Sequence, residues 1–228
     1  MSDPELVDTI IIGDTHADLD TYHRLLRREE ASHGRKLPSI QLGDYGFGYF
    51  SPREAEAVQR FHSTHRRHRF IRGNHDKPDE AREAPGFLAD GALSGSILFL
   101  GGADGGLQGW DTELDQGRMR SILAALSRMK AKPSVVISHD APQEVAQALN
   151  DDKMGQRQRL ATSRTREFLS AVHAAVRPHL WIFGHWHFSW EGAVGDTHFR
   201  CLDLAECFTM PLAWNPGAIT SLGEEDGY

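Results

Sequence analysis

Five polar blocks recur along this chain, and four of them directly follow a short apolar run. They are Gly13-Asp14-Thr15-His16, Gly43-Asp44, Gly73-Asn74-His75-Asp76, Ser138-His139-Asp140 and Gly184-His185-Trp186-His187. A short apolar run closed by glycine or a polar turn is typical of a buried strand that ends in a loop. In an α/β fold, residues at strand ends lie along one edge of the sheet, where active sites are usually found. The pattern therefore predicts an α/β protein whose strand ends converge on one polar site.

Strands and helices are predicted to alternate through most of the chain. Strands are expected at residues 9–12, 39–42, 69–72, 97–100, 135–137 and 180–183, with hairpin-like strands around 192–196 that continue to about 205. Helices are expected at residues 18–30, 52–65, 118–130 and 161–176. Residues 76–95 and 101–117 are rich in turn-forming residues and are predicted to be irregular loops.

Length, charge and cysteine content limit the classes of protein that fit. The 228 residues suit one domain over residues 1–228, with a short mobile tail after about residue 222. The net charge of −7 disfavours sequence-independent binding of nucleic acid, and no sequence-specific nucleic-acid partner is expected. Two cysteines make no disulfide framework, and no stretch approaches the ~20 apolar residues of a membrane span. These features favour a cytoplasmic protein without a membrane partner.

The polar blocks contain more metal-binding residues than one ordinary ion needs. The seven candidates are Asp14, Asp44, Asn74, His16, His139, His185 and His187. Seven ligands suit two ions that share one bridging carboxylate. Oxygen and nitrogen donors without thiolate favour Mn²⁺, with Fe, Zn, Ni or Co as alternatives. Two divalent ions in one site clamp a phosphoryl group and acidify a bridging water.

Taken together, the blocks resemble those of the calcineurin-like metallophosphoesterase superfamily, in particular its small bacterial and phage-type members. That pattern is GDxH, GD, GNHD/E, an isolated histidine and GHxH, and here it spans residues 13 to 187. The resemblance implies a four-layer αββα sandwich, in which two mixed β-sheets lie face to face between helices. It implies that one ion is held by Asp14, His16 and His187, and the other by Asn74, His139 and His185. Asp44 would bridge the two ions.

The same resemblance implies an enzyme that hydrolyses phosphomonoesters or phosphodiesters. A metal-bridging hydroxide would attack phosphorus, and His75 would protonate the leaving oxygen or stabilise the phosphoryl group. Asp76 resembles the partner that orients His75. The expected substrate is a phosphate ester, small or nucleotide-like, and Asn74, Arg72 and Tyr45 are candidates to contact it. Arg72 equally suits a pair with a surface carboxylate, and Tyr45 equally suits the core.

Two alternatives remain open at this stage. One is a Ser/Thr-type protein phosphatase, but the arginine expected after the second block is missing and the third block ends in Asp76. The other is a non-catalytic metal-binding scaffold on the same fold, although every ligand and His75 are retained. A further group, His62, His65 and His68, lies among arginines and is interpreted as a solvated basic helix end rather than a phosphate-binding face. The natural substrate, the native metal pair and the oligomeric state do not follow from the sequence.

Overall fold

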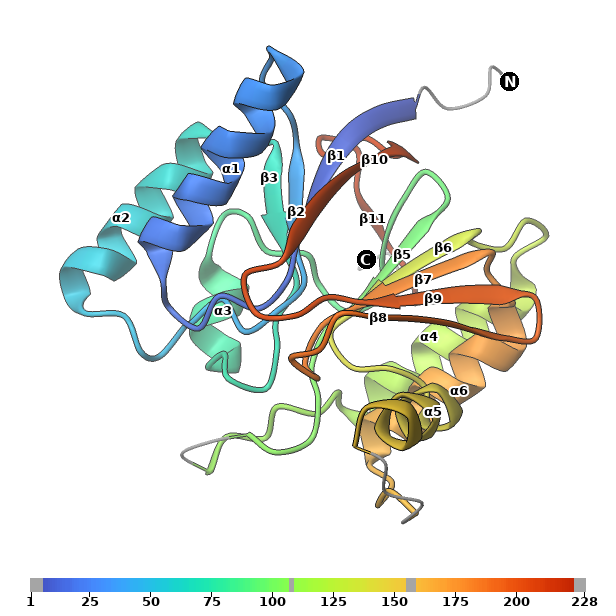
Figure 1. The fold of residues 1–228 in the computed structure, drawn as a ribbon. Coiled ribbons are helices and arrows are strands. Elements are labelled where there is room, and N and C mark those ends of the chain that lie inside the picture. The colour runs from blue at the N-terminus through green and yellow to red at the C-terminus, as the bar shows by residue number, and fades with distance from the viewer. Residues whose placement is uncertain (1–5, 107–108, 155–158, 224–228) are drawn as a thin grey trace, which may run out of the picture.

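A computed structural model describes residues 6–106, 109–154 and 159–223 of the chain. Figure 1 shows the elements in chain order: β1 (Leu6–Ile12), α1 (Leu19–His33), β2 (Ser39–Gln41), α2 (Pro52–Thr64), β3 (His68–Phe70), α3 (Pro78–Glu83), β4 (Ala92–Ser94), β5 (Ile97–Leu100), α4 (Gln116–Arg128), β6 (Val135–Ser138), α5 (Gln143–Met154), α6 (Arg164–Val176), β7 (Leu180–Phe183), β8 (Trp190–Val194), β9 (Thr197–Cys201), β10 (Cys207–Ala213) and β11 (Thr220–Ser221). No helix in this described part is long and apolar enough to cross a membrane.

The strands form two sheets, and both are mixed. The smaller sheet has the order β10-β1-β2-β3, in which β1 pairs antiparallel with β10 and parallel with β2. The larger sheet has the order β11-β4-β5-β6-β7-β9-β8, with parallel pairing from β5 through β9 and antiparallel pairing towards both edges. In each sheet the parallel strands run in one direction, so their carboxyl ends lie at a common edge.

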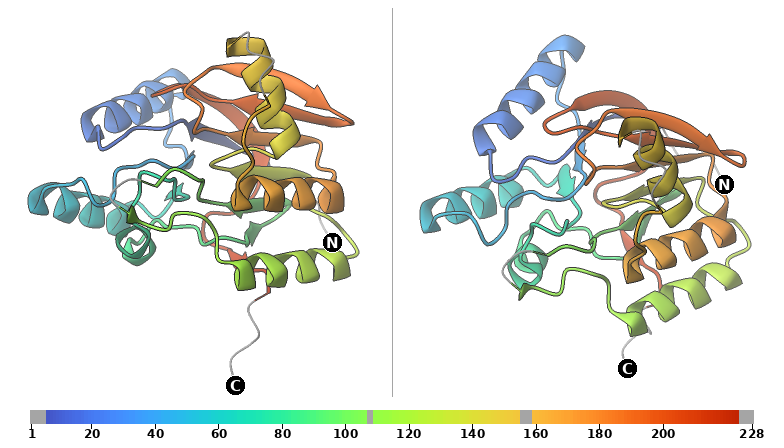
Figure 2. Two further views of the ribbon diagram at one scale, coloured as in Figure 1. Left: turned by 90° about the horizontal axis from the view of Figure 1, so that it is seen from below. Right: turned by 60° about the horizontal axis from the view of Figure 1, so that its bottom comes forward.

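Alternating side chains along the strands build the four layers. In β1, Ile11 packs into the apolar cluster between the two sheets, whereas Ile10 and Ile12 pack against α1 and α2. In β7, Ile182 joins the cluster between the sheets, and Trp181 and Phe183 face the helices of the other side. Figures 1 and 2 show α1 and α2 outside the smaller sheet, and α4, α5 and α6 outside the larger one. The predicted αββα sandwich is therefore confirmed.

Helix ends follow the chemistry of the local sequence. Ser51 accepts a hydrogen bond from the Glu54 backbone while the Glu54 carboxylate accepts one from the Ser51 backbone, which is a complete capping box before Pro52. Asp18 caps α1 by accepting from the Thr21 backbone N–H. All six predicted strands and all four predicted helices are present, with ends that differ by no more than three residues.

Several elements were not predicted. Residues 76–95 contain α3 and β4 instead of one irregular loop, and α5, β10 and β11 had no counterpart in the prediction. Pro211 lies within β10, and proline lowers the predicted strand tendency because it cannot donate to a ladder. The strand is tolerated because β10 is at the edge of the smaller sheet. Residues 107–108 of the second predicted loop and 224–228 of the predicted mobile tail lie outside the described residues.

The interpretation of the histidine group as a solvated helix end is wrong for two of its three members. His62 and His68 are buried, with 0% and 1% of their surface exposed. His68 Nδ1 lies 2.8 Å from Ser39 Oγ, and His62 Nδ1 lies 3.2 Å from the His68 carbonyl. His62 shares the buried face of α2 with Val58, one helical turn earlier, and the aromatic ring of Phe70 contacts it there.

Candidate metal centre

Loops at the carboxyl ends of five strands carry the predicted ligands. Asp14 and His16 follow β1, Asp44 follows β2 and Asn74 follows β3, all in the smaller sheet. The larger sheet supplies the rest, since His139 follows β6 and the pair His185 and His187 follows β7. The site is thus assembled where the corresponding edges of the two sheets meet.

One group of ligand atoms joins Asp14, His16, Asp44 and His187. The Nε2 atoms of His16 and His187 are 3.0 Å apart. His187 Nε2 is 3.2 Å from Asp14 Oδ2, and His16 Nε2 is 3.7 Å from Asp44 Oδ2. One donor atom from each of the four residues lies within 4.8 Å of the others, a spacing that suits a shared metal ion.

A second group joins Asp44 to His139, His185 and Asn74. The Oδ1 atom of Asn74 lies 3.0 Å from His139 Nε2 and 2.9 Å from His185 Nδ1. His139 Nε2 is 3.4 Å from Asp44 Oδ1. Asp44 therefore belongs to both groups, with Oδ2 towards the first and Oδ1 towards the second. The structure brings together all seven residues that the sequence nominated.

Three observations test whether these residues suit cations. Asp44 Oδ2 is buried and has no hydrogen-bond partner among the described residues, although buried polar atoms are nearly always paired. The Nε2 atoms of His16 and His187 face each other, and unless one of them is protonated both present a lone pair, which a cation between them would accept. The set also combines carboxylate, amide and imidazole donors, which suit Mn, Fe, Zn, Ni or Co. The donor set fits two divalent cations.

Four of the ligands have a strained backbone. His16, Asp44, His185 and His187 have φ angles of 44°, 53°, 69° and 52°. Non-glycine residues rarely adopt this left-handed region, and such strain gathers at functional sites where the surroundings enforce it. Glycine is required beside them for a different reason, because a Cβ at Gly73 would collide with Asp44 Oδ1. The tight loops thus bring donor atoms close together at some cost in backbone energy.

Hydrogen bonds outside the ligand groups hold the donors in place. His139 Nδ1 lies 2.8 Å from the Leu42 carbonyl, which fixes its tautomer and leaves Nε2 to face Asn74 and Asp44. The His185 backbone N–H donates to Asp14 Oδ2 at 3.0 Å, and the His75 backbone N–H donates to Asp44 Oδ1 at 2.7 Å. Each carboxylate is therefore oriented by a neighbouring ligand loop.

The charges of the site are strongly coupled. Burial alone would raise the pKa of Asp44, but the neighbouring His139 and further hydrogen bonds hold it well below its usual range. Burial lowers the pKa of His139, but the Asp44 carboxylate outweighs it and raises that pKa to about 10. Burial lowers the pKa of both His16 and His185, so the neutral imidazoles that bind metals are favoured there. The carboxylates thus create a negative site that attracts positive charge.

Sequence reasoning assigned no role to Asp140, although it lies in the fourth block. Its buried carboxylate accepts hydrogen bonds from Trp186 Nε1 at 2.9 Å and from Arg166 Nε at 3.0 Å. The Arg166 guanidinium also lies over the Trp186 ring, 5.5 Å from its centroid. This brace fixes the loop that carries His185 and His187. The signal available in the sequence was the position of Asp140 directly after His139.

His75 lies beside the ligands but belongs to neither group. Its ring centroid is 4.8 Å from that of His16, in an edge-on arrangement. It lines a cavity of about 210 Å³ together with His16, Gly46 and Tyr49. His75 is therefore placed to reach a group bound next to the first set of ligands.

The role predicted for Asp76, as the partner that orients His75, is not what the structure gives. The Asp76 carboxylate is fully buried and accepts four hydrogen bonds from the backbone N–H groups of Tyr45, Gly46, Phe47 and Gly73. None of the hydrogen bonds found among the described residues joins it to the His75 ring. Asp76 instead fastens the loop after β2 to the loop after β3, and these loops carry Asp44 and Asn74.

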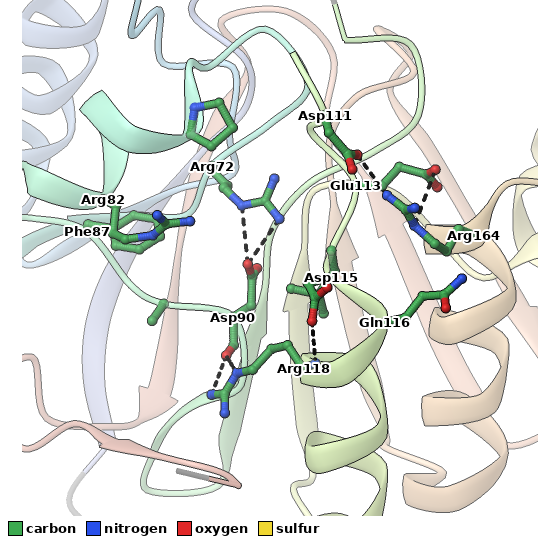
Figure 3. Close-up of a pocket in the computed structure, with 13 residues that line it drawn as sticks. Arg72, Arg82, Phe87, Asp90, Asp111, Glu113, Asp115, Gln116, Arg118 and Arg164 are labelled. Atoms are coloured by element: carbon green, nitrogen blue, oxygen red, sulfur yellow. Dashed lines mark hydrogen bonds and ion pairs between the residues drawn. The ribbon is translucent and has the colours of Figure 1, made fainter. Parts of the chain in front are cut away.

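Two predicted substrate contacts are also wrong. Tyr45 is 1% exposed and packs between Tyr22 and Phe70 in the core under the smaller sheet, so it cannot reach a substrate. Arg72 is 5% exposed and donates to the Asp90 carboxylate and the Thr112 carbonyl. Figure 3 shows Arg72 directed at Asp90 in a pocket where arginines and carboxylates pair with one another. The alternative interpretation of Arg72, an ion pair, is the one observed.

Comparison with known proteins identifies the family. Residues 8–189 match the calcineurin-like phosphoesterase family, and the chain therefore belongs to it. Membership makes this protein a metal-dependent hydrolase of phosphoric esters. A search of curated proteins finds no matching sequence.

Solved structures share the fold of this chain. The protein TT1561 of Thermus thermophilus superimposes with a TM-score of 0.56 at 12% identity, covering 90% of this chain and 98% of that one. A putative 5′-nucleotidase from Staphylococcus aureus gives a TM-score of 0.52 at 12% identity, covering 97% of this chain and 55% of that one. At these identities the similarity concerns the fold, and the chain spans just over half the length of the second protein.

Proposed function

We propose that this protein hydrolyses phosphomonoesters or phosphodiesters with two divalent cations held by the seven ligands. The observation that carries the proposal is Asp44, which faces both ligand groups and keeps one buried oxygen without a partner among the described residues. Asp14, His16 and His187 would hold one cation, and Asn74, His139 and His185 the other. When bound, two such cations acidify a shared water and neutralise charge on the phosphoryl oxygens. The oxygen and nitrogen donors suit Mn, Fe, Zn, Ni or Co, and Mn²⁺ is the metal we propose first among these.

His75 is the residue proposed to act on the leaving group. It lies outside both ligand groups, lines the adjoining cavity and has a ring in contact with His16. A protonated imidazole in this position donates its proton to the leaving oxygen or stabilises the phosphoryl charge. Asp76 contributes by fastening the loop from which His75 projects.

The ligand groups are open on two sides, which bears on the substrate. One side is the cavity that contains His75. The other is a hollow of about 510 Å³ lined by Asp14, His16, His187, Arg24 and Leu204 among others. A phosphodiester could place one alcohol group on each side, and a monoester would use one. Monoester and diester hydrolysis therefore both stay within the proposal.

Activity assays separate the enzyme from a non-catalytic scaffold. The protein reconstituted with Mn²⁺ is expected to hydrolyse p-nitrophenyl phosphate, bis(p-nitrophenyl) phosphate or both. If neither is turned over at full metal occupancy, the enzymatic proposal is wrong. A panel of phosphopeptides in the same assay tests the protein phosphatase alternative.

The variant Asp44→Asn tests the shared carboxylate. It is expected to weaken binding of both metals together, because one side chain faces both groups. Asp79→Asn makes the same chemical change at a side chain that is 83% exposed on α3, and should leave metal content unchanged. Metal analysis and p-nitrophenyl ester hydrolysis are measured for both variants. Wild-type metal content and rate in Asp44→Asn would refute the assignment.

A further inference from the structure

A pair of aromatic residues, the exposed Tyr49 and the half-buried Trp110, adjoins the candidate metal centre, and nothing in the hydrolysis scheme uses it. Tyr49 lies in the loop between β2 and α2, and 40% of its surface is exposed. It is one of only three large hydrophobic residues exposed among the described residues, with Leu6 and Leu204. Trp110, from the loop after β5, meets the Tyr49 ring edge-on with centroids 5.8 Å apart. Two loops that follow strands of different sheets thus meet in one aromatic pair.

The Tyr49 ring forms a wall of the cavity that contains His75. The lining residues are His16, Gly46, Tyr49 and His75, so a metal ligand and the proposed proton donor share the cavity with this ring. Burial, and next the Asp44 and Asp76 carboxylates, raise the pKa of the Tyr49 phenol. A group that leaves phosphorus on the side of His75 would lie against this ring.

The backbone holds the aromatic pair in position. The Tyr49 N–H donates to the Gly46 carbonyl at 3.1 Å, which closes a tight turn. Gly48 within that turn has a φ of 91°, a conformation that favours glycine. A Cβ at Gly48 would also collide with the Trp110 ring. The absent side chain at Gly48 therefore lets Trp110 pack over the turn and support Tyr49.

The chemistry of the cavity favours a planar ring over a second anion. Its lining offers two imidazoles and a phenol but no lysine or arginine, whereas the hollow lined by Asp14 and His187 contains Arg24. Aromatic rings attract one another through stacked or edge-on contacts that add to simple burial of apolar surface. An exposed tyrosine face next to a phosphate-ester site is suited to this contact.

We propose that Tyr49, supported by Trp110, binds a planar aromatic ring carried by the leaving group of the substrate. The preferred substrates are then aryl or nucleoside phosphate esters. This inference rests on the proposed function, since the leaving group is assigned to the side of His75. Tyr49 determines specificity and takes no part in the bond-breaking step.

Two non-hydrolysable ligands test the inference without relying on turnover. Benzylphosphonate and cyclohexylmethylphosphonate share one head group and one linker, and differ in whether the ring is aromatic. Isothermal titration of the Mn²⁺-loaded protein should give a Kd about 3- to 10-fold lower for the aromatic ligand.

Variants at the exposed ring assign the preference to Tyr49. Tyr49→Leu should bring the ratio of the two Kd values to about 1, and Tyr49→Phe should preserve it, because only the ring is needed. Leu6→Ala, at an exposed large hydrophobic residue that lines neither cavity, is the matched control and should leave the ratio unchanged. Equal binding of both ligands by the wild type overturns the inference, as does an unchanged ratio in Tyr49→Leu. Turnover of p-nitrophenyl esters is measured separately, so a failure of the hydrolysis proposal is recognised independently.

Discussion

The buried carboxylate of Asp76 gives the sharpest test of how the ligand loops are held. Its Oδ1 accepts from Gly46 N at 2.7 Å and Phe47 N at 3.0 Å, and its Oδ2 accepts from Gly73 N at 2.8 Å and Tyr45 N at 3.2 Å. In Asp76→Asn, one oxygen becomes an amide NH₂. Two buried backbone N–H donors would then face another donor.

The magnitude follows from the number of bonds lost. A buried polar group without a partner costs about 1–3 kcal/mol, so two of them cost about 2–6 kcal/mol. Part of this is offset, because burial and then the Asp44 charge raise the pKa of Asp76, and the neutral amide relieves both penalties. A loss of about 2–4 kcal/mol in the free energy of unfolding is therefore expected, a large share of the roughly 5–15 kcal/mol typical of a domain.

Urea denaturation measures this loss, and the midpoint should fall by roughly 1 M. Metal affinity should fall as well, because the loops that carry Asp44 and Asn74 are no longer fastened together. Asp79→Asn is the control, and as a surface change it should stay within about 0.5 kcal/mol of wild type. If Asp76→Asn kept its stability and metal content but lost kcat, the carboxylate would serve His75 after all and the argument would be refuted.

Three further outcomes are expected. His75→Ala should keep its metals, and its kcat should fall about 10²–10⁴-fold. The control variant His198→Ala, at an exposed histidine, should keep both its metals and its kcat. Loss of metal in His75→Ala would make His75 a ligand or a structural residue. Gly73→Ala should bind Mn²⁺ about 10- to 100-fold more weakly, because its Cβ collides with Asp44 Oδ1. Gly217→Ala is the control and should bind Mn²⁺ as the wild type does. Unchanged affinity in Gly73→Ala would contradict the close approach of Gly73 to Asp44. Burial, followed by the charge of Arg69, lowers the pKa of His62 to about 4, and burial with the charge of Arg67 lowers that of His68 to about 2. The unfolded chain then binds more protons below about pH 6.5, so stability is fully present above that pH and falls towards pH 4 by up to roughly 1.4 kcal/mol per unit for each histidine. Urea melts at pH 7, 6 and 5 check the slope, and His62→Gln should flatten it; an equal slope in that variant would contradict burial as the cause.

Much of the secondary structure could be predicted from the sequence, because strands and helices are marked by residue patterns over a few neighbouring positions. Apolar runs of four residues marked Ile97–Leu100 and Leu180–Phe183 with the observed boundaries, and Ser51-Pro52 marked the start of α2. The strand β10 was not readable, since Pro211 argues against a strand until its edge position is known. The local sequence thus predicts an element well when its own residue pattern favours it, and poorly when the element depends on its position in the sheet.

The roles of single polar residues were also predicted unevenly. The seven candidate ligands could be nominated from the sequence because each follows a predicted strand and is of a residue type that binds metals. Arg72, Tyr45 and Asp76 stand just as close to those ligands in the sequence, yet each turns into the protein. Their partners, such as Asp90 for Arg72, lie on other loops, and the sequence does not show which loops will pack together.

The sequence by itself predicted most of the strands and helices and nominated the seven candidate metal-binding residues, because both inferences depend on residue types at short spacing. Only the tertiary structure decided how these seven side chains are grouped and which of their sequence neighbours face the site. It placed Asp44 between two ligand groups, buried Tyr45, and exposed Tyr49 four residues later beside His75. The physical reason is that contacts between loops of different sheets depend on how the two sheets pack, and that packing is set by the whole core.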